Sequence, residues 1–212
     1  MKGKVVLIIL FVVGFVIGFA ITTHLKGDEE TTKHSKRCEE MTNLNGFVEF
    51  ISSSYSQRQF TSKPISDEII QKILVAGHRA GSARNAQPWH FTVVRNRELI
   101  DEIMNNVTDE NVLIVVSGPR EDPNSRFSMN FDCALATQNM FLAAQALGLG
   151  ARMYAIPVQN INENLLPKLG LPDENLRVKI VLRIGYEAED VDATTAASPR
   201  LPLENKVNFI VN

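Results

Sequence analysis

The stretch Ala80–Val94, AGSARNAQPWHFTVV, passes from small polar residues directly into an apolar run. Pro88 fixes its own backbone and disfavours the helical conformation for Gln87, so the polar turn ends where a strand begins. It follows SDEIIQKILVAGHRA, a helical pattern with an apolar stripe and with Ser66 as a suitable N-cap. The sequence therefore predicts a helix, a pinned turn rich in hydrogen-bond donors, and a strand.

Outward from this stretch, helical and strand patterns alternate. Further strands are predicted in VLIVVSG, ARMYAIP and RVKIVLRIGY. FDCALATQNMFLAAQALGLG predicts a long helix, apolar on much of its circumference and therefore central or at an interface, which ends at Gly148 and Gly150. The tail SPRLPLENKVNFIVN is predicted to be extended, with an edge strand at its end. Because no phosphate-binding glycine loop or nucleophile elbow is present, any difficult chemistry is expected to belong to a cofactor.

Composition excludes several classes of function. The 22 basic and 24 acidic residues give a net charge near zero, so no basic field indicates nucleic-acid binding. Cys38 and Cys133 lie in very different contexts, which argues against a disulfide, and Cys133 is expected to pack as a small apolar residue. His34 and Cys38 alone are too few ligands to predict a metal site.

The N-terminus carries an uncharged apolar run, Val5–Ile21. A membrane-spanning helix needs about 20 apolar residues, with ~17 as the lower bound, whereas the apolar part of a signal peptide is about 7–15 residues long. Residues 1–24 are therefore predicted to be a single-pass transmembrane anchor that is retained. The alternative is a cleaved signal, with Gly18 and Ala20 as the small residues before the cleavage site.

Two further regions follow the apolar run. Residues 25–45 are charged and poor in apolar side chains, which predicts a polar tether, and residues 46–212 form the predicted globular domain. Lys2 and Lys4 favour an N-terminus inside the cell, although basic residues also lie on the other flank of the run. The sequence prediction is thus a membrane protein with an extracytoplasmic domain.

The globular part resembles the FMN-dependent nitroreductase superfamily. Four segments carry the resemblance, in the order found in that family: SSYSQRQF, GSARNAQPWHF, DCALATQNMFLAAQALGLG, and IGY followed by PRLPLENKV. The resemblance implies an α+β, three-layer fold, with a central, mainly antiparallel sheet flanked by helices. It also implies an intimate homodimer with two FMN sites at its interface.

The resemblance further implies an FMN-dependent oxidoreductase. NADH or NADPH would reduce the flavin, which would then reduce a nitroaromatic, a quinone or a similar acceptor, and no catalytic side chain is required for hydride transfer. Ser54 and Ser198 stand where the family usually has cations. These departures keep an alternative open: a flavin-binding or interaction protein of the same fold without turnover.

Site residues also follow from the resemblance. Arg200 is expected at the FMN phosphate with the serines near residue 55, Arg58 near the pyrimidine edge, and the turn after Gly81 along the ribityl chain and ring edge. A backbone N–H between Met153 and Ile156 is expected to meet flavin N5. The residues assigned to FMN are Ser54, Ser56, Arg58, Ser82, Asn85, Gln87, Tyr154, Ala155 and Arg200.

Arg84 has three interpretations. It points to solvent without a role, it replaces a missing cation at the phosphate, or it lines the substrate channel and attracts anionic groups, which is the preferred interpretation. Trp89 is expected to be a core anchor, and His90 a strand residue without a catalytic role. The short chain from Asn105 to Phe131 lacks the Glu-Tyr-Lys trio of related dehalogenases, which argues against that activity.

Overall fold

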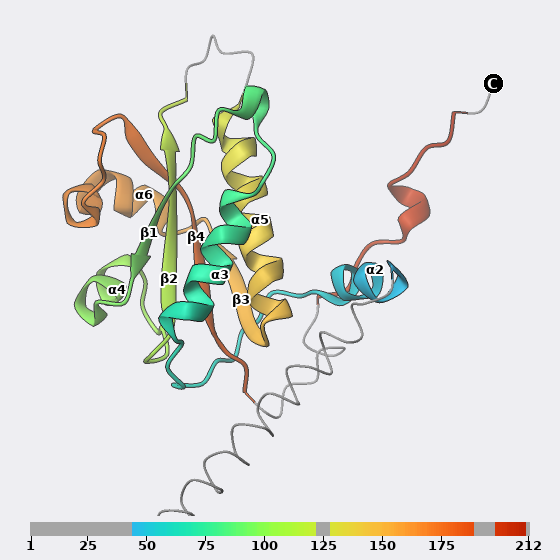
Figure 1. The fold of residues 1–212 in the computed structure, drawn as a ribbon, viewed down its shortest axis with the longest axis horizontal. Helices are drawn as coiled ribbons and strands as arrows, with labels where there is room; N and C mark the ends of the chain where they lie inside the picture. The colour runs from blue at the N-terminus through green and yellow to red at the C-terminus, as the bar shows by residue number, and fades with distance from the viewer. Residues whose placement is uncertain (1–43, 122–127, 189–197, 211–212) are drawn as a thin grey trace, which may run out of the picture. The chain divides into compact units, whose positions relative to one another are not determined.

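The computed structural model describes residues 44–121, 128–188 and 198–210. The chain divides into two units after Phe50. The described residues of the first unit belong to helix α2 (Leu44–Ser53), which continues into the second unit. The second unit holds a β-sheet and the helices that cover it (Figure 1).

The sheet has four strands, and every neighbouring pair is antiparallel. The strands are β1 (His90–Val94), β2 (Val112–Pro119), β3 (Leu149–Tyr154) and β4 (Leu176–Tyr186), in the order β1-β2-β4-β3. Residues 112–118 of β2 are all buried, since helices cover both faces of the sheet. The prediction of a mainly antiparallel sheet flanked by helices is confirmed.

Helices α3 (Asp67–His78) and α5 (Met129–Ala146) lie side by side on one face of the sheet (Figure 1). The predicted N-cap of α3 is confirmed: the Ser66 hydroxyl accepts a hydrogen bond from the Ile69 N–H over 3.4 Å. The two helices approach closely at Gly77, where a Cβ would lie 2.5 Å from Met140 Cγ. A glycine is therefore required at this crossing.

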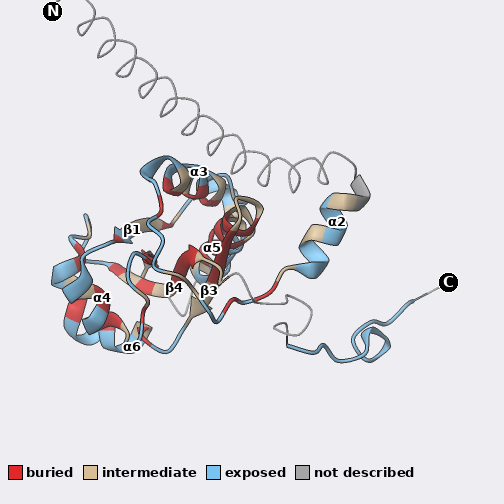
Figure 2. Ribbon diagram, turned by 90° about the horizontal axis from the view of Figure 1, so that it is seen from below, coloured by how far each residue is buried: buried red, intermediate tan, exposed pale blue. Residues whose placement is uncertain are grey.

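The other face of the sheet is covered by shorter helical elements. These are α4 (Arg97–Ile103), α6 (Val158–Asn160), and the turns η3 (Ile161–Leu165) and η4 (Leu166–Leu169). Their apolar side chains pack with Leu113 and Val115 of β2, whereas Ile114 and Val116 face α3 and α5. Buried residues consequently run through the sheet and the inward sides of the helices, as three layers require (Figure 2).

Two predictions about the end of elements are wrong. The described tail, residues 198–210, contains the 3-10 turn η5 (Leu203–Asn205) and no strand. Gly148, with φ of 79°, follows the end of α5 as expected, but Gly150 lies inside β3. A Cβ on Gly150 would lie 2.5 Å from Gln57 Cγ, so this glycine admits a neighbouring side chain instead of ending a helix.

The predicted membrane location also needs correction. Within the ranges 44–121, 128–188 and 198–210, no helix is both long enough and apolar enough to span a bilayer. The apolar run Val5–Ile21, on which the predicted anchor and extracytoplasmic orientation rested, lies outside the described residues, as do His34 and Cys38.

Candidate functional site

The polar turn between α3 and β1 has an unusual backbone. It contains η2 (Ala83–Asn85), and Arg84, Asn85 and Gln87 have φ values of 55°, 55° and 46°. Non-glycine residues seldom adopt positive φ, and such residues cluster at functional sites when surrounding contacts hold them. The turn is thus held in a strained conformation with the side chains of Arg84, Asn85 and Gln87 exposed.

Hydrogen bonds from inside and outside the turn hold it in place. The Gln87 N–H donates to Ser82 Oγ over 3.0 Å, and Gln87 Nε2 donates to the Asn85 carbonyl over 3.3 Å. The Ala83 N–H donates to both carboxylate oxygens of Asp132, over 3.2 and 3.3 Å. Asp132 is buried in the first turn of α5, so it ties the polar turn to the N-terminal end of that helix.

The second predicted group of site residues lies around the buried Tyr55 and Gln57. Gln145, near the C-terminal end of α5, donates from Nε2 to the Tyr55 carbonyl over 3.1 Å. The Gln57 N–H donates to the Ala151 carbonyl of β3 over 3.0 Å. Gln57 Oε1 also accepts from the Arg58 N–H over 2.7 Å. These bonds fix the segment 54–58 against α5 and β3.

Cations from distant parts of the sequence meet beside this segment. Arg58 Nη2 donates to Ser198 Oγ over 3.3 Å, and Arg200 Nη1 donates to the Ser198 carbonyl over 3.2 Å. All three residues are exposed, as is Ser56. Two guanidinium groups and two hydroxyls in one exposed region form a donor set suited to a phosphate group. Ser54 differs, because its hydroxyl already donates to the Ile51 carbonyl over 2.7 Å.

Tyr154 and Ala155 lie at the far end of β3 from the Gln57 contact. Tyr154 is half-buried on the strand, and Ala155 is exposed in the bend that leads to α6. From Ala151 to Ala155 an extended chain covers about 13 Å. The edge of β3 thus connects the Arg58 region to the predicted N5 contact.

A buried cation lies on the neighbouring strand. Arg183 is 5% exposed and donates to Asn111 Oδ1 and Thr108 Oγ1, each over 2.9 Å, while its guanidinium lies 4.1 Å from the ring centroid of Phe60. Burial lowers the pKa of Arg183 below its usual value. Arg152 is its cross-strand partner, so two arginines stand side by side next to the predicted site.

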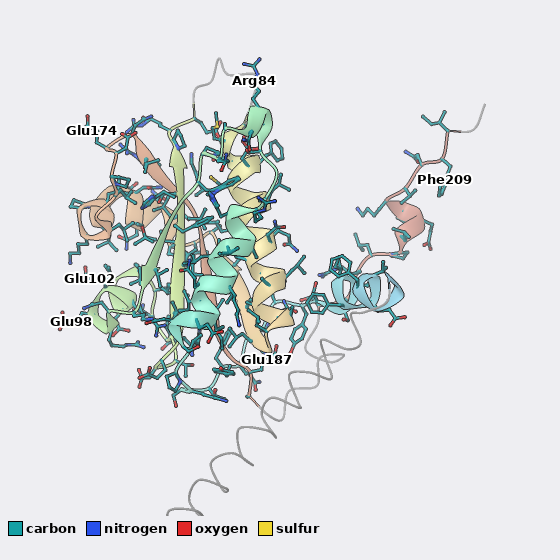
Figure 3. The ribbon with its side chains drawn as sticks, in the orientation of Figure 1. Arg84, Glu98, Glu102, Glu174, Glu187 and Phe209 are labelled. Atoms are coloured by element: carbon teal, nitrogen blue, oxygen red, sulfur yellow. The ribbon has the colours of Figure 1, made fainter. Side chains whose placement is uncertain are left out.

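The structure does not bring all the predicted site residues together within one chain. Asp132 contacts the turn, Gln145 contacts the segment 54–58, and the two lie 13 positions apart, which corresponds to about 20 Å of helix. Figure 3 shows the same separation, since Arg84 and Glu187, the bridge partner of Phe60, lie at opposite ends of the sheet and α5. The polar turn and the residues around Arg58 therefore lie at opposite ends of α5.

Sequence reasoning missed the buried side chains that hold these two groups. Asp132, Gln145 and Gln57 are 5%, 1% and 1% exposed. Two of them lie on α5, a helix that is apolar on much of its circumference, and a buried polar side chain needs a hydrogen-bond partner. The polar residues within this helix could have indicated buried hydrogen bonds, but the sequence pattern does not predict which groups they bind.

Comparison with known proteins identifies the family. The family model described as "Nitroreductase family" matches residues 51–111 and 103–186. A relative from Archaeoglobus fulgidus, provisionally named NADH dehydrogenase/NAD(P)H nitroreductase, is 35% identical over 153 residues, which cover 68% of this chain and 87% of the relative. The chain belongs to the nitroreductase family.

Solved structures agree with this assignment. A nitroreductase-like protein from Desulfovibrio desulfuricans, solved in complex with FMN, has a TM-score of 0.64 and 29% identity, covering 78% of this chain and 96% of that protein. A nitroreductase from Bacteroides fragilis with bound FMN has a TM-score of 0.65 and 24% identity, covering 80% and 100%. At that identity, the second comparison supports the fold alone.

Proposed function

We propose that this protein is an FMN-dependent oxidoreductase that takes electrons from NADH or NADPH and passes them to a small acceptor such as a nitroaromatic or a quinone. The observation that carries the proposal is the convergence of Arg58 and Arg200 on Ser198 beside the segment 54–58. A phosphate monoester carries nearly two negative charges and three acceptor oxygens, which suit two guanidinium groups and hydroxyl donors. The residues present thus fit the FMN phosphate.

Each residue has a definite part in holding the cofactor. Arg200, Arg58 and the Ser56 hydroxyl would bind at the phosphate end, with Arg58 reaching toward the ring. Ser54 would contribute as a donor only after its hydroxyl turns away from the Ile51 carbonyl. The backbone near Tyr154 and Ala155 would contact the ring, and bound FMN would supply hydride and electron transfer. The protein's own task is to position the ring and the two substrates.

The second group of residues would serve the same flavin from another protomer. Ser82, Asn85 and Gln87 are separated from the phosphate-binding residues by about 20 Å of helix, so the two groups around one FMN are assigned to different chains in this proposal. A homodimer with antiparallel α5 helices brings the turn of one protomer to the phosphate end of the other. Exposed apolar side chains on α5 support such an interface: Phe131 is 75% exposed and Leu135 51%.

A spectroscopic experiment tests the proposal. The purified protein is expected to bind one FMN per chain, to lose its yellow colour when NADPH or NADH is added without oxygen, and to regain it when a quinone or nitroaromatic follows. A yellow protein that neither nucleotide bleaches would leave only flavin binding without turnover. A colourless protein that takes up no added FMN would contradict the proposed function altogether.

A further inference from the structure

A cavity of about 510 Å³ opens at the other end of β4 from the Phe60 bridge. It exists because β3 is shorter than β4: the last pair between them is Tyr154 with Val181, so β4 residues before Val181 lack a strand neighbour on that side. Asn162 replaces part of the missing strand, since its side chain donates to the Val178 carbonyl over 2.9 Å and accepts from the Val178 N–H over 2.8 Å. The opening is therefore held open by specific contacts.

Lys179 is directed to this cavity by an irregularity of the sheet. The pairs Val116 with Ile180 and Ser117 with Val178 leave Lys179 as an extra residue of β4. Bulges of this kind re-aim a side chain and are common beside functional sites. The lysine stem passes beside Gly118 of β2, where a Cβ would lie at an ordinary contact distance of 3.6 Å from Lys179 Cε.

The charge of Lys179 is only weakly compensated. Burial lowers the pKa of its amine, an effect that the charge of Glu121 opposes. The Glu121 carboxylate itself accepts hydrogen bonds from the Asn130 N–H, over 2.9 Å, and from Ser128 Oγ, over 3.3 Å. Among the described residues, no carboxylate lies within ion-pair distance of Lys179.

The rest of the lining has both apolar and cationic parts. Ala134, Val158 and Ile180 supply apolar surface, and Arg120 adds a second cation. The third cation, Arg177, is occupied by backbone carbonyls, since its Nη1 donates to Glu174 and Leu176 oxygens over 2.6 and 2.7 Å. A cavity of this volume that combines an apolar wall with more cations than carboxylates suits a small organic anion.

From these observations, we propose that this cavity binds a small organic carboxylate, whose charged group is held by Lys179 and Arg120 and whose apolar body lies against Ala134, Val158 and Ile180. The proposal goes beyond the proposed FMN chemistry and does not depend on it. A bound anion would neutralise the positive charge of Lys179 and Arg120 that Glu121 offsets only in part.

Calorimetric titration of the full-length protein, saturated with FMN, tests the proposal with benzoate as the probe. Benzoate is expected to bind saturably, and benzamide, its neutral analogue, to bind at least about tenfold more weakly, as loss of a charge-assisted contact implies. Lys179→Met, which keeps an apolar stem, is expected to lower benzoate affinity by a similar factor. Lys179→Arg should retain benzoate binding, as should Lys72→Met, which removes an exposed cation of α3.

Several results would overturn the proposal. These are equal affinity for benzoate and benzamide, unchanged affinity in Lys179→Met, or inorganic phosphate binding as tightly as benzoate. Displacement of FMN by benzoate would also overturn it, because the cavity would then belong to the flavin site. If the protein takes up no FMN at all, the proposed function fails, but the same titrations on the flavin-free protein still decide this proposal.

Discussion

At the scale of single residues, Arg58, Ser198 and Arg200 show how a binding group arises from separate parts of the sequence. Arg58 lies 140 positions before Ser198, yet its guanidinium donates to the Ser198 hydroxyl. The resemblance to the nitroreductase superfamily predicts cations at two nearby positions, where this chain has Ser54 and Ser198. Arg58 and Arg200 are consequently the two cations that meet at Ser198.

Replacing Arg200 tests that charge. Arg200→Ala is expected to weaken FMN binding about ten- to hundredfold, which corresponds to the loss of a hydrogen bond to a charged group. Fluorescence titration with FMN measures the change. Lys206→Ala, which removes another exposed cation of the same tail, serves as the control and should bind FMN as the parent does. Equal affinity of the two variants would remove Arg200 from the phosphate site.

Arg84 is exposed in the strained turn, which leaves its three interpretations to experiment. Arg84→Asn removes the charge and keeps a residue type that tolerates positive φ. If Arg84 attracts anionic substrates, this variant retains FMN and shows a higher KM for NADPH, with a weaker dependence of kcat/KM on salt concentration. A fall in FMN affinity would instead assign Arg84 to the phosphate, and no change in either quantity would leave it without a site role.

At the scale of elements, α5 acts as a rigid spacer between the two groups of site residues. Its N-terminal turn holds the polar turn through Asp132, and its C-terminal turn holds the segment 54–58 through Gln145. Both side chains are buried, so their hydrogen bonds are shielded from water. Disturbing either end should therefore alter the site as well as the stability of the fold.

Asp132→Ala tests the first of these ends. It leaves the Ala83 N–H without its partner in a strained turn, so the free energy of unfolding is expected to fall by about 1–3 kcal/mol, with a parallel loss of FMN affinity. Urea denaturation and FMN titration measure the two effects. Asp132→Asn keeps a side-chain oxygen acceptor, so it should retain most of the free energy of unfolding and most of the FMN affinity. If the Asp132→Ala variant binds FMN as tightly as the Asp132→Asn variant, Asp132 does not position the turn.

The glycines of the sheet give a second test at this scale. A Cβ on Gly185 would lie 2.7 Å from Asn111 Cγ, and the Asn111 amide also binds the Thr61 carbonyl and Arg183. Gly185→Ala is expected to lower the free energy of unfolding by about 1–3 kcal/mol through overpacking. Gly81→Ala is the matched control, because a Cβ there meets no atom within 4 Å. Similar urea midpoints for the two variants would contradict the prediction.

The sequence predicts these elements well where local patterns decide them. Ser66 and the apolar stripe after it define α3, and the alternation of strand and turn residues locates all four strands. Prediction fails where distant contacts decide the outcome. Gly150 looks like a helix stop but lies in β3. A glycine stands there because the Gln57 side chain occupies the space that a Cβ would need. The alternating tail near Phe209 forms no strand in the described chain, since a strand requires a neighbour that pattern alone does not supply.

The candidate site shows the same limit. The resemblance assigns residues to the flavin one by one, and the structure gathers Arg58 with Ser198 and Arg200. It also separates them from Ser82 and Asn85 by most of the length of α5. The sequence does not show which residues contact each end of α5. This separation therefore could not be predicted before those contacts and the length of the helix were known.

At the scale of the whole molecule, the site is proposed to be shared between two protomers, each supplying one end of α5. Such a site has a genetic signature. A chain with Arg200→Ala impairs only the site to which it contributes the phosphate-binding residues. A chain with Asn85→Ala impairs only the site to which it contributes the polar turn. A mixed dimer of the two variants then concentrates both lesions in one site and leaves the other intact.

The two deficient variants are thus expected to complement each other. Co-expressed chains with different affinity tags, purified as the mixed dimer, should bind one FMN with parental affinity and regain about half of the parental activity, whereas each homodimer stays deficient. A mixed dimer as deficient as its parents would mean that each chain builds its site alone. In that case each chain would hold a complete FMN site of its own, although Asp132 and Gln145 anchor its residues at opposite ends of one helix.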